Sequence, residues 1–258
     1  MTFKAQFIAM FEQPIRAWAE SSIIGRAQKN SLIDIHIESI LNSVRGNHHK
    51  VDDTPYGGGP GELMRIDVVE PLIKKALGRH HDISRAKKRV VMLDPAGTPF
   101  NQDHAKRLAS YHELIFVCGR YEGIDARIHH FVDEAISLGD FVLSNGDVAA
   151  MAVFDACVRM QPGFLGNYSS IEQESHMNHR LEASHYTRPR EYHGFLVPQV
   201  FQNGNHQEID KARLEESLIK TTQLRPDLIS AQPLDEHEEK VLKFADSYQK
   251  YPWQKKYE

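Results

Sequence analysis

Three short apolar runs, each ending at a loop of glycine and polar residues, constrain the fold of this chain more than any other feature. The runs are residues 89–93, 113–118 and 141–143, and the loops that end them are residues 94–97, 119–123 and 144–147. A short apolar run bounded by turn-forming residues is typical of a buried strand followed by a tight loop. We therefore predict a strand at each run.

Helical spacing fills the chain between these runs, at residues 102–111 and 125–136. Strands that alternate with helices indicate an α/β fold with a parallel sheet. Loops at the carboxyl ends of such strands face one crevice, because backbone amides and helix N-termini converge there. The three loops are therefore predicted to share one ligand pocket.

The pattern changes after a further helix, which is predicted from Val148 to Met160 with Asp147 as its cap. Residues 163–190 are rich in Ser, Asn, His and Glu, a composition that suits an exposed linker. We predict an α/β domain at residues 1–162 and a linker at residues 163–190.

Two amphipathic helices are predicted beyond the linker, at residues 208–223 and 235–249. The second begins with Asp235 and Glu238 at the spacing of a capping box, in which each side chain satisfies a backbone amide of the first turn. A small helical domain is therefore predicted at residues 191–258.

Composition limits where the chain works and what it binds. No apolar run is long enough to span a bilayer, and Glu12 and Arg16 interrupt any export signal at the N-terminus. The two cysteines have no metal-type spacing partner, so a reducing, cytoplasmic location is expected. A formal charge of −4 means that RNA binding must depend on local basic patches, such as Arg188 and Arg190.

Several motifs favour a structural interpretation when taken alone. The glycine cluster at residues 56–61 is neither a P-loop nor a dinucleotide fingerprint, since Glu62 stands where the last glycine should be. A turn is favoured there. The histidine pairs at residues 48–49, 80–81 and 129–130 point apart on a strand and do not share a helix face. We expect no metal site.

Five segments, taken together and in order, carry a resemblance that no single motif carries. They are residues 51–61, 118–125, 138–146, 185–189 and 204–209. In this arrangement the chain resembles the TrmD family, SPOUT-class tRNA methyltransferases that methylate N1 of the guanine 3′ of the anticodon with S-adenosyl-L-methionine. The resemblance implies a trefoil knot in the α/β domain, a helical C-terminal domain at residues 191–258 that binds tRNA, a homodimer with active sites at the subunit interface, and tRNA as substrate.

The resemblance also assigns roles to residues of this chain. It places the cofactor at Leu93, Asp94, Pro95, Gly119, Tyr121, Glu122, Leu138, Gly139, Asp140, Phe141, Val142, Leu143, Asn145 and Gly146. The family's catalytic arginine falls on Arg159, and its general base falls on Glu174, where the family usually has aspartate. A carboxylate can remove the N1 proton, and a guanidinium can stabilise the charge that then spreads to O6.

Other functions fit parts of the same pattern. A divergent paralogue would methylate another RNA nucleotide, and a catalytically silent protein would keep the fold but only bind tRNA. A nicotinamide-dependent enzyme is disfavoured because the chain has no GxGxxG fingerprint.

Overall fold

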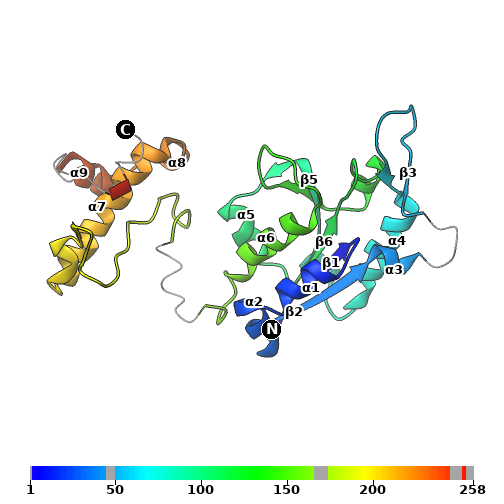
Figure 1. The fold of residues 1–258 in the computed structure, drawn as a ribbon, viewed down its shortest axis with the longest axis horizontal. Coiled ribbons are helices and arrows are strands. Elements are labelled where there is room, and N and C mark those ends of the chain that lie inside the picture. The colour runs from blue at the N-terminus through cyan, green and yellow to red at the C-terminus, as the bar shows by residue number, and fades with distance from the viewer. Residues whose placement is uncertain (1, 45–49, 166–173, 245–251, 254–258) are drawn as a thin grey trace. The chain divides into compact units, whose positions relative to one another are not determined.

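The computed structural model describes residues 2–44, 50–165, 174–244 and 252–253. The chain divides into two compact units, Met1–Gly166 and Asn167–Glu258 (Figure 1). The first unit holds the large sheet, and the second is built mainly of helices. The finer division into domains at residues 162 and 190 stays a prediction.

A five-stranded parallel sheet forms the centre of the first unit, which confirms the predicted α/β class. Its strand order is β2-β1-β6-β5-β7, with bounds Ile33–Ser39, Phe3–Ala9, Glu113–Cys118, Lys88–Pro99 and Glu134–Ser137. The predicted runs at residues 89–93 and 113–118 lie in the neighbouring strands β5 and β6, where Leu93 pairs with Cys118. Their carboxyl ends therefore meet at one edge.

Side chains of the central strands alternate between two hydrophobic clusters, one on each face of the sheet. In β6, Leu114 and Phe116 pack into one cluster, and Ile115 and Val117 pack into the other. Because side chains alternate along a strand, a run that is apolar at every position must be covered on both faces. This explains why residues 114–118 are all buried.

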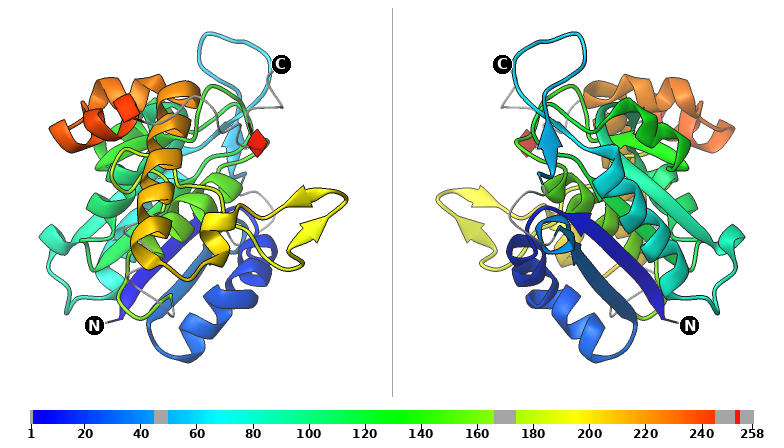
Figure 2. Two further views of the ribbon diagram at one scale, coloured as in Figure 1. Left: turned by 90° about the vertical axis from the view of Figure 1, so that its left-hand side faces the viewer. Right: turned by 90° about the vertical axis from the view of Figure 1, so that its right-hand side faces the viewer.

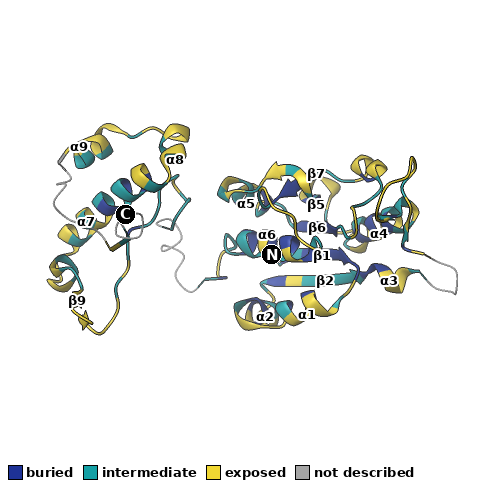
Figure 3. Cartoon of the chain, turned by 45° about the horizontal axis from the view of Figure 1, so that its top comes forward, coloured by how far each residue is buried: buried dark blue, intermediate teal, exposed yellow. Residues whose placement is uncertain are grey.

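Helices cover both faces of the sheet, and Figure 3 shows their outward sides as exposed and the central strands as buried. Residues of α1, α2, α5 and α6 contribute to one cluster, with bounds Gln13–Ala19, Ser22–Lys29, Gln102–Leu108 and Asp147–Val158. Residues of α3, α4 and the 3-10 helix η2 contribute to the other, with bounds Ile40–Ser43, Ile66–Arg79 and Ala126–His130. Another 3-10 helix, η1, spans Arg85–Lys87.

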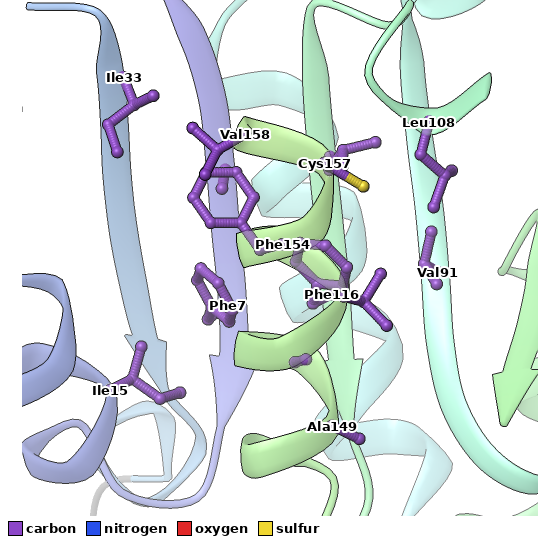
Figure 4. Close-up of a cluster of buried hydrophobic side chains, with 14 of the residues drawn as sticks. Phe7, Ile15, Ile33, Val91, Leu108, Phe116, Ala149, Phe154, Cys157 and Val158 are labelled. Carbon is purple, nitrogen blue, oxygen red and sulfur yellow. The ribbon is translucent and has the colours of Figure 1, made fainter. Parts of the chain in front are cut away.

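An aromatic group ties helix α6 to the middle of the sheet (Figure 4). Phe154 of α6 meets Phe7 of β1 edge-on, with ring centroids 5.9 Å apart, and Phe116 of β6 at 6.2 Å. Phe7 and Phe116 stack at 5.1 Å, and all three side chains are fully buried. Paired aromatic rings add to the free energy of burial, so this group fixes α6 on the sheet.

The predictions of a strand at residues 141–143 and of a helix at residues 125–136 were wrong. Residues 141–143 form a loop, and the third strand is β7, Glu134–Ser137, which overlaps the end of the helix predicted at 125–136. Only the short η2 forms there. Glu134 accepts hydrogen bonds from Arg89 at 2.6 Å and from Arg107 at 2.6 and 3.0 Å, so distant cations hold this polar stretch in the sheet.

Two further boundaries differ from the sequence-based expectation. Strand β5 runs on through residues 94–97 to Pro99, with a shift of register against β7 between Leu93 and Thr98. The cap of α6 is Gly146, and Asp147 is the first helical residue with no capping bond from its side chain. The Asp147 amide instead donates to the Asn145 side chain at 2.9 Å. Asn145 therefore provides the side-chain bond to the start of α6 that was expected from Asp147.

The second unit contains α7, α8 and α9 together with a small hairpin of β8 and β9, the yellow arrows in both views of Figure 2. Their bounds are His206–Leu224, Pro226–Ala231, Glu236–Phe244, Glu191–Tyr192 and Phe195–Leu196, and a 3-10 helix, η4, spans Gln199–Gln202. The capping box of α9 is confirmed, since the Glu238 amide donates to Asp235 at 2.8 Å and the Asp235 amide to Glu238 at 3.1 Å. Residues 245–249 of this predicted helix lie outside the described residues.

Candidate active site

A pocket of about 370 Å³ lies beside the middle of β5, where β6 and β7 end. Its walls come mainly from residues 92–96 of β5 and from the segments that follow β6 and β7. This volume falls in the range of about 300–1,000 Å³ that small-molecule sites occupy. The lining residues are Met92, Leu93, Asp94, Pro95, Ala96, Gly119, Arg120, Tyr121, Glu122, Gly123, Ile124, Ile136, Ser137, Leu138, Phe141, Val142, Leu143, Ser144, Asn145, Gly146 and Ala149.

Most residues that the sequence assigned to the cofactor lie together around this pocket. The exceptions are Gly139 and Asp140, which are not among its lining residues. Nine lining residues were not assigned, and three of them lie inside the motif at residues 118–125. The nine are Met92, Ala96, Arg120, Gly123, Ile124, Ile136, Ser137, Ser144 and Ala149. Ser137 could not be found because the strand that ends with it was not predicted.

The loops after β6 and β7 touch through their backbones. The Gly146 amide donates to the Gly119 carbonyl at 2.9 Å. A Cβ at residue 146 would lie 3.0 Å from both Cys118 Cα and Gly119 N, closer than most real contacts of a Cβ. Glycine at 146 therefore permits the close approach that shapes this wall of the pocket.

The glycine-rich cluster belongs to a hairpin that borders the pocket. Strands β3, Asp52–Asp53, and β4, Leu63–Met64, pair antiparallel, and the cluster forms the projecting loop between them (Figure 1). Its glycines at residues 57, 58, 59 and 61 all have positive φ, and none lines the pocket, so the cluster is a turn as expected.

Backbone hydrogen bonds attach this hairpin to the loop after β6. Met64 N donates to Gly123 O at 2.9 Å, and Glu122 N donates to Glu62 O at 3.1 Å. A Cβ at Gly61 would lie 2.3 Å from Cγ of Glu122, so the glycine leaves room for that side chain. The hairpin therefore fixes the loop that carries Tyr121 and Glu122.

A buried ionisable group lies just behind the pocket wall. Asp147 is 2% exposed, and burial raises the pKa of its carboxyl, with Arg120 and Cys118 partly opposing. The Arg120 guanidinium lies 4.8 Å from the centre of the Phe11 ring. Burial also raises the pKa of the Cys118 thiol far above its usual range, so this thiol stays protonated and is a poor nucleophile.

The two residues with proposed catalytic roles belong to different units and lie outside this pocket. Arg159 is the C-cap of α6 in the first unit. Glu174 belongs to the second unit, where it lines a cavity of about 310 Å³ with Arg180, Arg213 and Glu238. A single unit therefore does not contain both residues.

Neither a metal site nor a membrane-spanning helix occurs within the residues that the structure describes. In that part of the chain, no group of three or more His, Cys, Asp or Glu side chains is placed to hold a metal ion. No helix within the same residues is both long enough and apolar enough to cross a membrane.

A parallel sheet with a pocket at its carboxyl edge defines the class of α/β proteins that bind a small ligand between strand-end loops. The model of one family, described as tRNA (Guanine-1)-methyltransferase TrmD, matches residues 3–231. The chain belongs to this family.

Individual relatives agree with the family match. The chain is 45% identical to a protein of Streptococcus pyogenes over 223 residues, which are 86% of this chain and 90% of that protein. It is 40% identical to a protein of Limosilactobacillus reuteri over 242 residues, 93% of this chain and 94% of that one. Both relatives are named tRNA (guanine-N(1)-)-methyltransferase.

Proposed function

We propose that this protein is a tRNA methyltransferase that transfers a methyl group from S-adenosyl-L-methionine to N1 of the guanine 3′ of the anticodon, position 37 of the tRNA. The observation that carries the proposal is the family match over residues 3–231 together with a pocket lined by two of the segments that carry the resemblance, residues 118–125 and 138–146. Fold alone would not indicate an activity, because one fold serves many chemistries.

The pocket residues suit this methyl donor. Leu93, Leu138 and Phe141 offer apolar surface to a flat adenine ring, and the carboxylates of Asp94 and Glu122 suit a ligand with positive charge and hydroxyl groups. The glycines at 119 and 146 let the backbone approach the ligand closely. When bound, S-adenosylmethionine supplies an electrophilic methyl group on a positively charged sulfur.

Glu174 and Arg159 fit the two tasks that the protein must perform. The N1 of neutral guanine carries a proton, so a base must remove that proton before the nitrogen can attack. Glu174 accepts this proton, an assistance typically worth ~10²- to 10⁴-fold in rate. Arg159 stabilises the negative charge that spreads to O6, because a guanidinium placed at developing charge lowers the barrier.

The position of Arg159 supports a homodimer. Ala149 lines the pocket near the start of α6, and Arg159 lies at the other end, roughly 15 Å away at about 1.5 Å per residue. Arg159 is thus far from the pocket of its own chain. We assign it to the pocket of a second copy.

Exposed apolar side chains at the carboxyl edge of the sheet support the same assembly. Large patches of this kind usually mark a surface that another protein covers. Those in the segments that follow the strands are Phe11, Leu41, Tyr121, Phe141, Val142, Leu143 and Val148, each at least 38% exposed. Light scattering at micromolar concentration should give the mass of two chains, and a monomer would contradict the assignment.

The remaining family expectations are part of the same proposal. The substrate is tRNA, the protein acts in the cytoplasm, and the chain around the pocket is threaded as a trefoil knot. The predicted separate linker at residues 163–190 carries Glu174 between the α/β domain and the helical domain.

One experiment tests the activity. Purified protein is incubated with radiolabelled methyl donor and tRNA transcripts that carry either guanine or adenine at position 37. We expect label only in the first transcript, and nuclease digestion should place it in 1-methylguanosine. Label at another nucleotide would favour a divergent paralogue, and no label with retained tRNA binding would favour a silent RNA-binding protein.

A further inference from the structure

The segment that carries Glu174 is held against helix α7 soon after that residue. The Leu181 amide donates to the Thr221 hydroxyl at 2.8 Å, and the Leu181 carbonyl accepts from the Ser217 hydroxyl at 2.6 Å. Thr221 is fully buried, and it lies one helical turn after Ser217. Hydroxyl groups of α7 therefore hold both the amide and the carbonyl of Leu181.

Residues 174–180, which we call the base turn, form a closed turn before this contact with α7. Met177 N donates to Glu174 O at 3.2 Å, and His176 N donates to Arg180 O at 2.8 Å. His176 and His179 have positive φ of 72° and 54°, a conformation that side chains other than glycine adopt rarely. Such strained positions persist only where surrounding contacts hold them.

The Arg180 side chain provides those contacts. It donates to both carboxylate oxygens of Glu238, at 3.0 and 2.7 Å, and to the carbonyls of Gln232 at 3.1 Å and Pro233 at 3.4 Å. The Arg180 and Glu238 side chains are only 11% and 17% exposed. Two parallel charge-assisted bonds fix orientation as well as distance, so they hold the turn more precisely than one bond would.

Glu238 is itself a fixed partner. It is the residue that closes the capping box of α9 with Asp235. The hydrogen bonds of Arg180 therefore connect the base turn to the first turn of α9. Glu174, Arg180 and Glu238 line the same cavity of about 310 Å³. Because the capping box fixes the Glu238 side chain, the ion pair gives the Arg180 guanidinium a defined position.

We propose that Arg180 is a positioning residue, which sets the place of the Glu174 carboxylate by tying the base turn to α9. The inference rests on the proposed role of Glu174 as the base. Because the helical domain is expected to bind tRNA, the contact between Arg180 and α9 keeps the base in a fixed place relative to the bound guanine. Arg180 belongs to the second unit and is not among the residues that line the donor pocket.

Arg180→Met in the full-length protein tests this directly, since it keeps the aliphatic stem and removes the guanidinium. A displacement of ~1 Å at a reacting group can cost ~10²-fold in rate, so we expect kcat to fall by about ten- to a hundredfold. The tRNA KM and the donor Kd should stay within about twofold, because only positioning in the reacting complex is lost. Arg180→Lys should recover part of kcat, since it keeps the charge but not the bidentate geometry.

Glu238→Gln changes the other partner of the Arg180–Glu238 ion pair. Glutamine still serves at this position of a capping box, so α9 should keep its first turn while the charge on Arg180 goes unmatched. We expect a smaller fall of kcat in the same direction. Arg85→Met is the control from the first unit, because Arg85, although its side chain is 54% exposed, also bonds a carboxylate, Asp133, and a backbone carbonyl, that of Lys88. It should turn over like the parent protein.

The outcomes separate the inference from the proposed function. If the parent methylates tRNA and Arg180→Met has the same kcat, the inference is wrong and the function stands. A raised tRNA KM at unchanged kcat, or a melting temperature lowered far more than in Arg85→Met, would show a binding or structural role and also overturn it. If the parent transfers no methyl group to tRNA, the proposed function fails, and the inference that rests on it fails too.

Discussion

The Gly146 amide donates a hydrogen bond to the Gly119 carbonyl at 2.9 Å and so joins the loops that follow β6 and β7. These two loops supply two walls of the pocket. They meet at Gly146, where an added Cβ would be too close to the backbone of Cys118. The shape of the pocket therefore depends on the absence of a side chain at residue 146.

Gly146→Ala should lower the affinity for S-adenosylmethionine at least about tenfold, or about 1.4 kcal/mol. The reason is steric, since φ at this residue is −78° and alanine can adopt it, but its Cβ would lie 3.0 Å from Cys118 Cα. Separating the two loops should also cost about 1–3 kcal/mol of unfolding free energy. Calorimetric titration and urea denaturation measure the two effects.

Gly78→Ala is the control for this substitution. Gly78 lies in α4, and a Cβ added there would have no atom of another element within 4 Å, so alanine should stabilise the helix by about 0.5–1 kcal/mol and leave donor affinity unchanged. Equal donor affinity in the parent and Gly146→Ala would refute the steric explanation.

Glu174→Gln should remove most methyl transfer, by ~10²- to 10⁴-fold, because the amide keeps the shape of the side chain but cannot accept a proton. Affinity for the methyl donor should not change, since Glu174 lies outside the donor pocket. Single-turnover assays and calorimetry give the two quantities. Glu172→Gln, at a neighbouring position outside the described residues, should have far less effect, and parental turnover in Glu174→Gln would rule this base out.

Asp147→Asn should change stability in a way that depends on pH. Burial raises the pKa of Asp147, so the folded state holds its proton more tightly than the unfolded state does. The parent therefore loses stability as pH rises from the unfolded pKa, about 3.8, through the folded value. Asparagine cannot ionise, so the unfolding free energy of the variant relative to the parent should increase over this window.

Asp125→Asn should show the opposite sign and serves as the comparison. Arg127 holds the pKa of Asp125 down to about 2, so its contribution to stability is present above about 3.8 and is lost as pH falls toward 2. Asp125→Asn should thus destabilise at neutral pH, by less than about 1 kcal/mol because its partner Arg127 is 65% exposed and solvent screens the pair. Urea denaturation from about pH 3 to 7 measures both variants, and parallel curves would contradict the two signs.

Arg188, Arg190 and Arg213 should contact tRNA phosphates. They line a groove of about 660 Å³ in the second unit together with Tyr186 and Phe201, whose rings lie 5.4 Å apart. Each Arg→Met change should weaken tRNA binding and reduce the slope of log K against log salt by about 0.7–0.9. Filter binding at several salt concentrations measures the slope.

Arg225→Met is the control for these arginines, since Arg225 forms a bidentate pair with Asp227 in the same unit. Its salt slope should equal that of the parent. A loss of affinity in Arg188→Met at an unchanged slope would show that no phosphate contact had been removed.

The sequence by itself determined features that depend on nearby residues. The apolar runs at 89–93 and 113–118 became neighbouring strands of a parallel sheet, and the glycine cluster at 56–61 became a turn. The Asp235–Glu238 capping box formed because its two partners are three residues apart. The three predicted segments at residues 94–97, 119–123 and 144–147 contribute to one pocket, although only the second directly follows a strand that the pattern marked.

Tertiary structure decided the features whose partners are distant in sequence. Strand β7 exists where a helix was expected, because Arg89 and Arg107, 45 and 27 residues away, neutralise Glu134 and hold it in the sheet. Arg180 meets Glu238 from 58 residues away, and no local pattern marks that pair. Pairing of this kind depends on which surfaces the folded chain brings together, so periodicity and spacing, which report only local geometry, could not reveal it.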